Sequence, residues 1–257
     1  MVRNLPFTAG LTALIVFVLI HGTCSTEDNH HCASSSCGNI QNISHPFRLK
    51  SDPQTCGDPR YELSCENDHT VLYLYAGKYY VQEIDYNNST IRVVDSGIQK
   101  DNYFSIPSYS LYPYNFSSRR SAMSYDLSNL INSRIVVFMS CEKPVNNRFY
   151  LDTSTCKENG EYSSNSSISH YKRYKYVTIG TISATEVEDS CRLEQMVLTS
   201  RPRNDNPNIS CTEVHNELVY GFELSWFSAI CEIHCGRGHP CYLDDLNNVR
   251  CEGKMGG

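Results

Sequence analysis

The sequence lacks any long apolar run beyond its first residues. Its one such run, residues 7–20, follows the lone early charge of Arg3 and ends in the small-residue stretch 21–25. This run is shorter than the ~20 residues that a membrane-spanning helix needs. We therefore interpret residues 1–25 as a secretory signal peptide, with an uncleaved anchor as the alternative. Secretion would place the rest of the chain in an oxidising, extracellular compartment.

An excess of basic residues is also missing. Acidic residues outnumber lysine and arginine by 28 to 22, which gives a formal net charge of −6. A negative balance argues against nucleic acid as a partner. The mean hydropathy of −0.41 indicates a modest hydrophobic core, which disulfides would have to supplement.

Motifs of hydrolytic catalysis are absent as well. The sequence contains no G-x-S-x-G and no H-E-x-x-H segment, so the usual signatures of a serine hydrolase or a zinc protease are missing. Its closely spaced acids, Glu186/Glu188 and Asp244/Asp245, stand in polar surroundings typical of solvated side chains. An enzyme is therefore the weakest functional hypothesis, and we expect neither catalytic residues nor a cofactor.

Cysteine, in contrast, is abundant. Of the 13 cysteines, Cys24 would leave with the signal peptide, and we predict that the remaining twelve form disulfides. They fall into even groups, so pairing within groups is possible, although the sequence does not choose among the connectivities. No cysteine stands between Cys65 and Cys141. The groups are Cys32, Cys37, Cys56 and Cys65; Cys141 and Cys156; Cys191 and Cys211; and Cys231, Cys235, Cys241 and Cys251.

The last cysteine group also contains the ligand types of a zinc site. Two histidines, His234 and His239, stand among its four cysteines. The interval Cys241-x9-Cys251 does not fit the close pairs of structural zinc ligands. We therefore predict two disulfides with solvent-facing histidines, and no metal.

The pattern of apolar residues predicts a mostly β fold. Residues 71–97 are rich in Tyr, Val and Ile, and turn signals at 76–77 and 87–88 divide them into a three-stranded antiparallel meander. Further strands are expected in 133–141, 174–184 and 191–200, one short helix in 211–222, and loops in 101–118 and 153–169. We expect two small disulfide-rich antiparallel β modules with little helix, residues 26–150 and 151–257.

Sequons for N-linked glycosylation support the extracellular interpretation. The tripeptide Asn-x-Ser/Thr is used where it lies on the surface of a secreted protein. The predicted acceptors are Asn42, Asn87, Asn88, Asn115, Asn165 and Asn208.

Tyrosine is the abundant aromatic residue, with 18 copies against a single tryptophan. Exposed tyrosine rings can stack on sugar rings, while the alternative is that they pack a small sheet. Basic residues interleaved with tyrosine, as in the segment HYKRYKY, suit a polyanionic sugar or a solvated strand edge. The predicted ligand-binding residues are Tyr79, Tyr80, Arg92, Lys172, Arg173 and Lys175.

Two segments resemble parts of a known receptor family. The first runs from CASSSCGNIQNISHPFRLK through CGDPRYELSC to KYYVQEIDYNNSTIRVVD, and it resembles the galacturonan-binding module of plant wall-associated and leaf-rust-resistance-type receptor-like kinases. Its matching positions include Cys37-Gly38 and the turn at His45-Pro46-Phe47. The second, YGFELSW with CEIHCGRGHPCYLDDLNNVRC, is similar to the C-terminal wall-associated-kinase-type module through Gly221-Phe222, Trp226 and its closing cysteines.

The resemblance implies an extracellular, non-catalytic ectodomain that binds pectin or another acidic cell-wall polysaccharide. In full-length relatives a transmembrane helix and a Ser/Thr kinase follow, so the chain is expected to be either a secreted protein of the apoplast or a fragment of a cell-surface receptor. The alternative function is a protein-interaction ectodomain or decoy in plant defence, with a receptor or an apoplastic protein as partner. Residues 32–95 contain only five basic residues, and bridging calcium ions are one way to offset their small number.

Overall fold

The computed structural model describes residues 32–103, 105–116, 125–127, 133–156, 173–180, 183–202, 210–236, 239–244 and 249–252. The helices and strands of these described ranges lie in the unit formed by residues 34–257. The fold is mostly β, as predicted. Two larger sheets and two short hairpins, β1–β2 and β14–β15, account for the strands of the described ranges.

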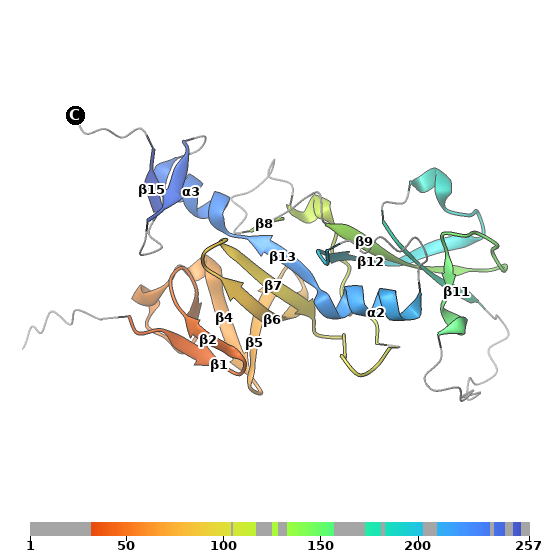
Figure 1. Ribbon diagram of the computed structural model, residues 1–257, viewed down its shortest axis with the longest axis horizontal. Helices are drawn as coiled ribbons and strands as arrows, with labels where there is room; N and C mark the ends of the chain where they lie inside the picture. The colour runs from red at the N-terminus through yellow and green to blue at the C-terminus, as the bar shows by residue number, and fades with distance from the viewer. Residues whose placement is uncertain are drawn as a thin grey trace, which may run out of the picture. The chain divides into compact units, whose positions relative to one another are not determined.

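The first sheet has seven strands in the order β3-β4-β5-β6-β7-β13-β8 (Figure 1). Its neighbours are antiparallel except for the parallel pair β3–β4. The predicted meander is confirmed, because β5, β6 and β7 pair in order along the chain. The bounds are β3 (Arg48–Leu49), β4 (Glu62–Glu66), β5 (His69–Leu74), β6 (Gly77–Asp85), β7 (Thr90–Asp95), β8 (Asp126–Leu127) and β13 (Phe222–Ser225).

Strand β13 reaches the first sheet from far along the chain. Phe222 pairs with Val93 of β7, and Leu224 pairs with Leu127 of β8. The residue before β13 must be glycine, since Gly221 has a φ of 75° and a Cβ there would lie 2.0 Å from the carbonyl oxygen of Val93. The module boundary at 150/151 stays a prediction, but both larger sheets contain strands from each side of it.

The core of the first sheet is aromatic. Phe47 contacts Trp226 edge to face with ring centroids 4.8 Å apart, and Tyr79 contacts Phe222 at 5.5 Å. The hairpin of β1 (Ser35–Cys37) and β2 (Ile40–Ile43) adds Cys37, Ile40 and Ile43 to the same cluster. Hydrophobic burial on this scale is the main stabilising contribution in the first sheet.

The second sheet has four strands in the order β10-β11-β9-β12, and its three pairings are antiparallel. These are β9 (Arg134–Cys141), β10 (Leu151–Asp152), β11 (Tyr174–Ile179) and β12 (Cys191–Thr199). Strands were expected at β9, β11 and β12, whereas β10 was missed because two residues give no periodic signal.

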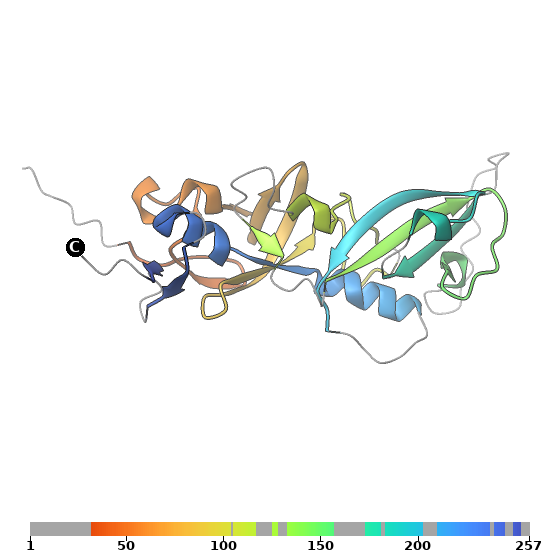
Figure 2. The same cartoon turned by 90° about the horizontal axis from the view of Figure 1, so that it is seen from above.

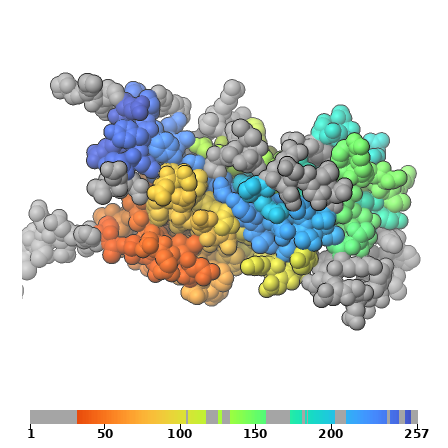
Figure 3. Space-filling view, in the orientation of Figure 1, coloured from red at the N-terminus to blue at the C-terminus, as the bar shows by residue number. Residues whose placement is uncertain are grey.

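Helix α2 (Cys211–Tyr220) is the predicted short helix, and it contacts β7 as well as β9 and β12. It lies between the strands of the first sheet and those of the second (Figures 2 and 3). Val214 and Leu218 pack against Val136, Val177 and Val197 of the second sheet. The Ser210 hydroxyl caps the helix by accepting the backbone N–H of Glu213 at 3.1 Å.

The loop after β7 is anchored by one buried carboxylate. Asp95 is 3 % exposed and accepts the backbone N–H groups of Gly97, Ser108 and Tyr109. Leu111 then donates its N–H to the carbonyl of Met196 in β12 at 2.9 Å. Residues 101–118 were expected to form a loop, and their described part is irregular apart from the 3₁₀ turn Pro113–Phe116.

Disulfides link neighbouring parts of both sheets. Cys37–Cys65 ties the first hairpin to β4, while Cys141–Cys191 joins β9 to β12 and Cys156–Cys211 joins the second sheet's loop to α2. The last two bonds cross between groups, so pairing within the groups Cys141/Cys156 and Cys191/Cys211 is not what the fold adopts. Cys32 and Cys56 are disulfide-bonded as well.

The closing cysteine segment folds as a helix followed by a hairpin. Helix α3 (Phe227–Cys235) precedes β14 (Cys241–Leu243) and β15 (Val249–Cys251). Two disulfides, Cys231–Cys241 and Cys235–Cys251, fasten the helix to the hairpin. Helix α3 was not predicted, because its nine residues begin at Phe227 and the N-cap residue Trp226 provides no side-chain cap. Among the described helices, none has the length and apolar character to cross a membrane.

Candidate functional site

One face of the first sheet carries tyrosines and lysines together. The antiparallel register places Glu66 opposite His69, Tyr73 opposite Lys78 and Val71 opposite Tyr80. Because side chains alternate along a strand, these residues share the face that points away from the aromatic core. We call the set Lys50, Glu66, His69, Tyr73, Lys78 and Tyr80 the tyrosine–lysine face.

A two-residue turn fixes this register. Strand β5 ends at Leu74 and β6 begins at Gly77, with Tyr75 in the left-handed region at φ 53°. Such a turn places Leu74 opposite Gly77, which aligns Tyr73 with Lys78. A shift by one residue would turn both side chains into the core.

Glu66 connects the two strands of the face. It accepts a hydrogen bond from the Tyr73 hydroxyl at 2.8 Å and one from Lys78 Nζ at 2.7 Å. The hydrogen bond from Lys78, followed by the one from Tyr73, holds the pKa of the Glu66 carboxyl below its ordinary value. The same contacts raise the pKa of Lys78 and of Tyr73. The carboxylate therefore stays ionised and orients a neutral tyrosine and a charged lysine.

Two cations lie over the tyrosine rings. Lys50 Nζ is 5.6 Å from the centre of the Tyr73 ring, and Lys78 Nζ is 5.7 Å from that of Tyr80. The His69 ring lies 4.8 Å from the Tyr80 ring. Tyr73 remains 51 % exposed, so a ring with a positive charge beside it is accessible from solution.

Most other basic groups of residues 32–95 are already occupied. Arg48 is buried and paired with Glu62, Arg60 is paired with Asp58, and Arg92 with Glu83. No ion pair of Lys50 occurs among the residues that the structure describes. Lys50 is consequently the basic group of this segment best able to meet an external anion.

Chemically, the face combines the two elements that a uronic acid requires. A tyrosine ring can cover the apolar face of a pyranose, and its hydroxyl can bond to sugar hydroxyls. An ammonium group beside the ring can pair with a carboxylate of the sugar. The tyrosine–lysine face is therefore a candidate surface for an acidic sugar chain.

Five of the six residues predicted to bind ligand are described, and the structure distributes them over both sheets. Tyr80 belongs to the tyrosine–lysine face, whereas Tyr79 is 2 % exposed, so its ring lies in the core and is closed to a ligand. The Arg92 guanidinium lies 4.9 Å from the centre of the Tyr220 ring and is paired with Glu83. Tyr79 and Tyr80 are adjacent in a strand, so their side chains point to opposite faces of the sheet. The sequence alone does not say which of the two faces the core.

The second predicted basic cluster lies on the other sheet. Arg173 Nη2 is 3.2 Å from Glu142 Oε1, and Lys175 is paired with Glu194. Lys172 falls outside the described residues. The predicted residues thus do not form one site, and the residues that sequence reasoning missed are Lys50, Glu66, His69, Tyr73 and Lys78. The signal that could have found them is the pairing of Tyr73 with Lys78 across the turn at 75–76.

The predicted glycosylation sites differ in their surroundings. Asn42, Asn87 and Asn88 are exposed, and Asn115 is half-buried. Asn88 donates its side-chain N–H to Asp85 at 2.7 Å. Asn165 and Asn208 fall outside the described residues. Use of these sites stays a prediction.

Within the described ranges, no group of three or more His, Cys, Asp or Glu side chains is arranged to hold a metal ion. The cysteines of the closing segment are occupied by their disulfides, and His234 and His239 are exposed.

Comparison with known proteins identifies the segment that carries the face. Residues 32–95 match the family model described as wall-associated receptor kinase galacturonan-binding. Every residue of the tyrosine–lysine face lies inside this galacturonan-binding match. No curated protein and no solved structure matches the chain. The likeness of the C-terminal segment to a wall-associated-kinase-type module therefore stays a prediction.

Two residues within the matched segment have a clear structural role. Gly38 has a φ of 54°, and a Cβ there would lie 2.0 Å from the carbonyl oxygen of Asp68. Phe47 is fully buried against Trp226 and Tyr61. These residues hold the fold of the matched segment, whereas Tyr73 and Lys50 are exposed within it.

Proposed function

We propose that the chain is an extracellular, non-catalytic module that binds de-esterified galacturonan, the acidic polysaccharide of pectin, through the tyrosine–lysine face. The observation that carries the proposal is the exposed Tyr73 ring with Lys50 Nζ 5.6 Å from its centre, inside the segment that matches a galacturonan-binding family. Stacking supplies shape recognition, and the ammonium groups supply recognition of the carboxylates.

The charge of the face favours de-esterified over methyl-esterified chains. Methyl esterification removes the negative charge of the sugar carboxylates. Lys50 and Lys78 then lose the anions with which they would pair, while the tyrosine rings can still stack on the sugar rings. Binding should also weaken as salt is raised from low concentration to about 0.15 M, where charges more than about 8 Å apart are screened.

The test is affinity electrophoresis and calorimetry of the disulfide-bonded protein with de-esterified galacturonan oligomers, with and without a calcium chelator. We expect Tyr73→Ala to weaken binding up to about tenfold, from the loss of about 0.5–1.5 kcal/mol of ring contact. Lys50→Ala should weaken it severalfold. Tyr242→Ala is a matched control, because its ring has the same 51 % exposure but lies in β14.

Lys143→Ala is the control for charge, since Lys143 is exposed and lies next to the second sheet. Equal retention of Tyr73→Ala, Lys50→Ala and the unmodified protein would contradict the assignment of the face. Retention lost only with chelator would assign the contact to bridging calcium instead. A protein partner that co-purifies after pectinase treatment, without retention on galacturonan, would favour an interaction ectodomain.

A further inference from the structure

A cavity of about 280 Å³ lies between α2 and the second sheet. Its walls include Val214 and Leu218 of α2, Phe138 of β9 and Val177 of β11. The cavity opens to solvent, and its volume is close to the lower end of the ~300–1,000 Å³ that small-molecule sites span. None of its lining residues belongs to residues 32–95, so the cavity is separate from the tyrosine–lysine face.

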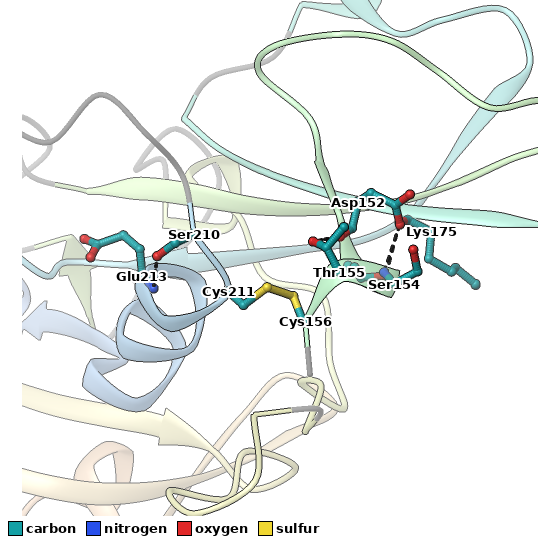
Figure 4. Close-up of a disulfide and its surroundings, with 9 residues drawn as sticks. Asp152, Ser154, Thr155, Cys156, Lys175, Ser210, Cys211 and Glu213 are labelled. Atoms are coloured by element: carbon teal, nitrogen blue, oxygen red, sulfur yellow. Dashed lines mark hydrogen bonds between the residues drawn. A yellow bond between two sulfur atoms is a disulfide. The ribbon is translucent and has the colours of Figure 1, made fainter. Parts of the chain in front are cut away.

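Covalent and hydrogen bonds hold the walls in place. The disulfide Cys156–Cys211 fastens the turn at 153–155 to the first residue of α2 (Figure 4). Both cysteines line the cavity. Within the turn, Thr153 Oγ1 donates to the carbonyl of Lys175 at 3.1 Å. A site with fixed walls loses little conformational entropy when it binds a ligand.

The lining is aromatic and aliphatic inside and charged at one edge. Tyr103 and Phe138 line the cavity, and Phe138 belongs to the face of the second sheet that packs against α2, whereas the Tyr176 ring lies in the cluster on the opposite face. Tyr103 is 46 % exposed and lies 4.3 Å from the His215 ring, so it stands where the cavity meets solvent. Lys175 and Glu194, which form an ion pair, also line it.

We propose that this cavity binds a small aromatic molecule that carries one hydroxyl or amino group, of the size of phenol or indole. The rings of Tyr103 and Phe138 can contact a ligand ring edge to face. Lys175 and Glu194 offer a donor and an acceptor to the polar end of the ligand. The combination of an apolar cavity with a few convergent polar groups is typical of small-molecule sites.

The experiment is ligand-observed NMR on the disulfide-bonded protein, with phenol and indole as probes and cyclohexanol as a non-aromatic probe of similar size. Val214→Phe places a ring in the cavity and should weaken the binding of both aromatic probes at least tenfold. Val219→Phe is the matched control, because it makes the same change on the same helix at a position that does not line the cavity. It should leave binding unchanged.

A second pair of variants covers the case in which Val214→Phe does not fold. Tyr103→Ala removes a partly exposed wall and should weaken binding at least threefold, while Tyr242→Ala should not change it. The proposal is overturned if phenol and indole do not bind, if cyclohexanol binds as tightly, or if the cavity variants bind as the unmodified protein does. Because the two sites share no residue, galacturonan binding and aromatic binding can fail independently.

Discussion

The two sheets are stabilised by different means. The first encloses a cluster of large aromatic side chains, in which Phe47, Tyr61, Phe222 and Trp226 are at most 3 % exposed. The second packs a short valine row against α2 and leaves a cavity there. It is reinforced by Cys141–Cys191 and Cys156–Cys211.

A buried charge also connects α2 to the second sheet. Glu217 of α2 is 0 % exposed and is paired with Arg134 of β9, while Thr199 Oγ1 donates to its carboxylate at 2.9 Å. Where the aliphatic core is small, a polar network and disulfides connect helix and sheet. Where the core is large, the outer face of the sheet carries exposed side chains such as Tyr73.

The largest effect is expected from Phe222→Ala. This ring comes from β13, packs against Tyr79 and completes the first core. Its loss should lower the free energy of unfolding by about 3–5 kcal/mol, measured by urea denaturation. Phe149→Ala, at a ring that is 57 % exposed, should change it by less than about 0.5 kcal/mol. A loss below about 1 kcal/mol for Phe222→Ala would contradict the conclusion that the aromatic cluster is the main source of stability in the first sheet.

Removing Cys156–Cys211 tests the covalent contribution to the second sheet. The double variant Cys156→Ser/Cys211→Ser opens a loop with a sequence separation of 55 and should cost about 2–4 kcal/mol. Cys231→Ser/Cys241→Ser opens a separation of 10 and should cost less, because a shorter loop constrains the unfolded chain less. The reverse order in urea denaturation would contradict the larger contribution expected of Cys156–Cys211.

Glu217→Gln tests the buried charge. Breaking its pair with Arg134 should lower the free energy of unfolding by about 1–3 kcal/mol at neutral pH. Burial raises the pKa of Glu217, an effect that Thr199 and then the two arginines partly offset. A raised pKa in the folded state means that the folded protein holds the proton more tightly, so the contribution of Glu217 to stability falls as the pH rises through that pKa.

The measurement is urea denaturation of both proteins between mildly acidic and neutral pH. The stability advantage of the unmodified protein over Glu217→Gln should grow as the pH falls through this window. A difference that does not vary with pH would contradict the raised pKa. Glu213→Gln, on the same helix and paired with Arg201, is the control.

The smallest effect on stability is expected at the tyrosine–lysine face. Tyr73→Ala should change the free energy of unfolding by less than about 0.5 kcal/mol, as is usual for surface positions. Its effect should appear in galacturonan binding alone. A loss of stability comparable with that of Phe222→Ala would mean that Tyr73 serves packing, and the functional contrast between the sheets would not hold.

Most of the local structure could be predicted from the sequence. The meander of residues 71–97, the strand at 133–141 and the helix at 211–222 were predicted from periodicity and turn residues, and the structure confirms them. Helix α3 was missed because a nine-residue segment without a cap gives a weak signal. The candidate site was found only in part, since Tyr80 was named but Tyr73, Lys78 and Lys50 were not.

By itself, the sequence determined the mostly β class, the disulfide chemistry of its cysteines and the segment 32–95 that matches a galacturonan-binding family. These depend on residue type and local spacing. Only the tertiary structure decided that β13 completes the first sheet, that Cys156 pairs with Cys211, and that Tyr79 is buried while Tyr73 is exposed. Each of these depends on contacts between residues far apart in the chain or on which face of a sheet the core covers, and local spacing does not specify either.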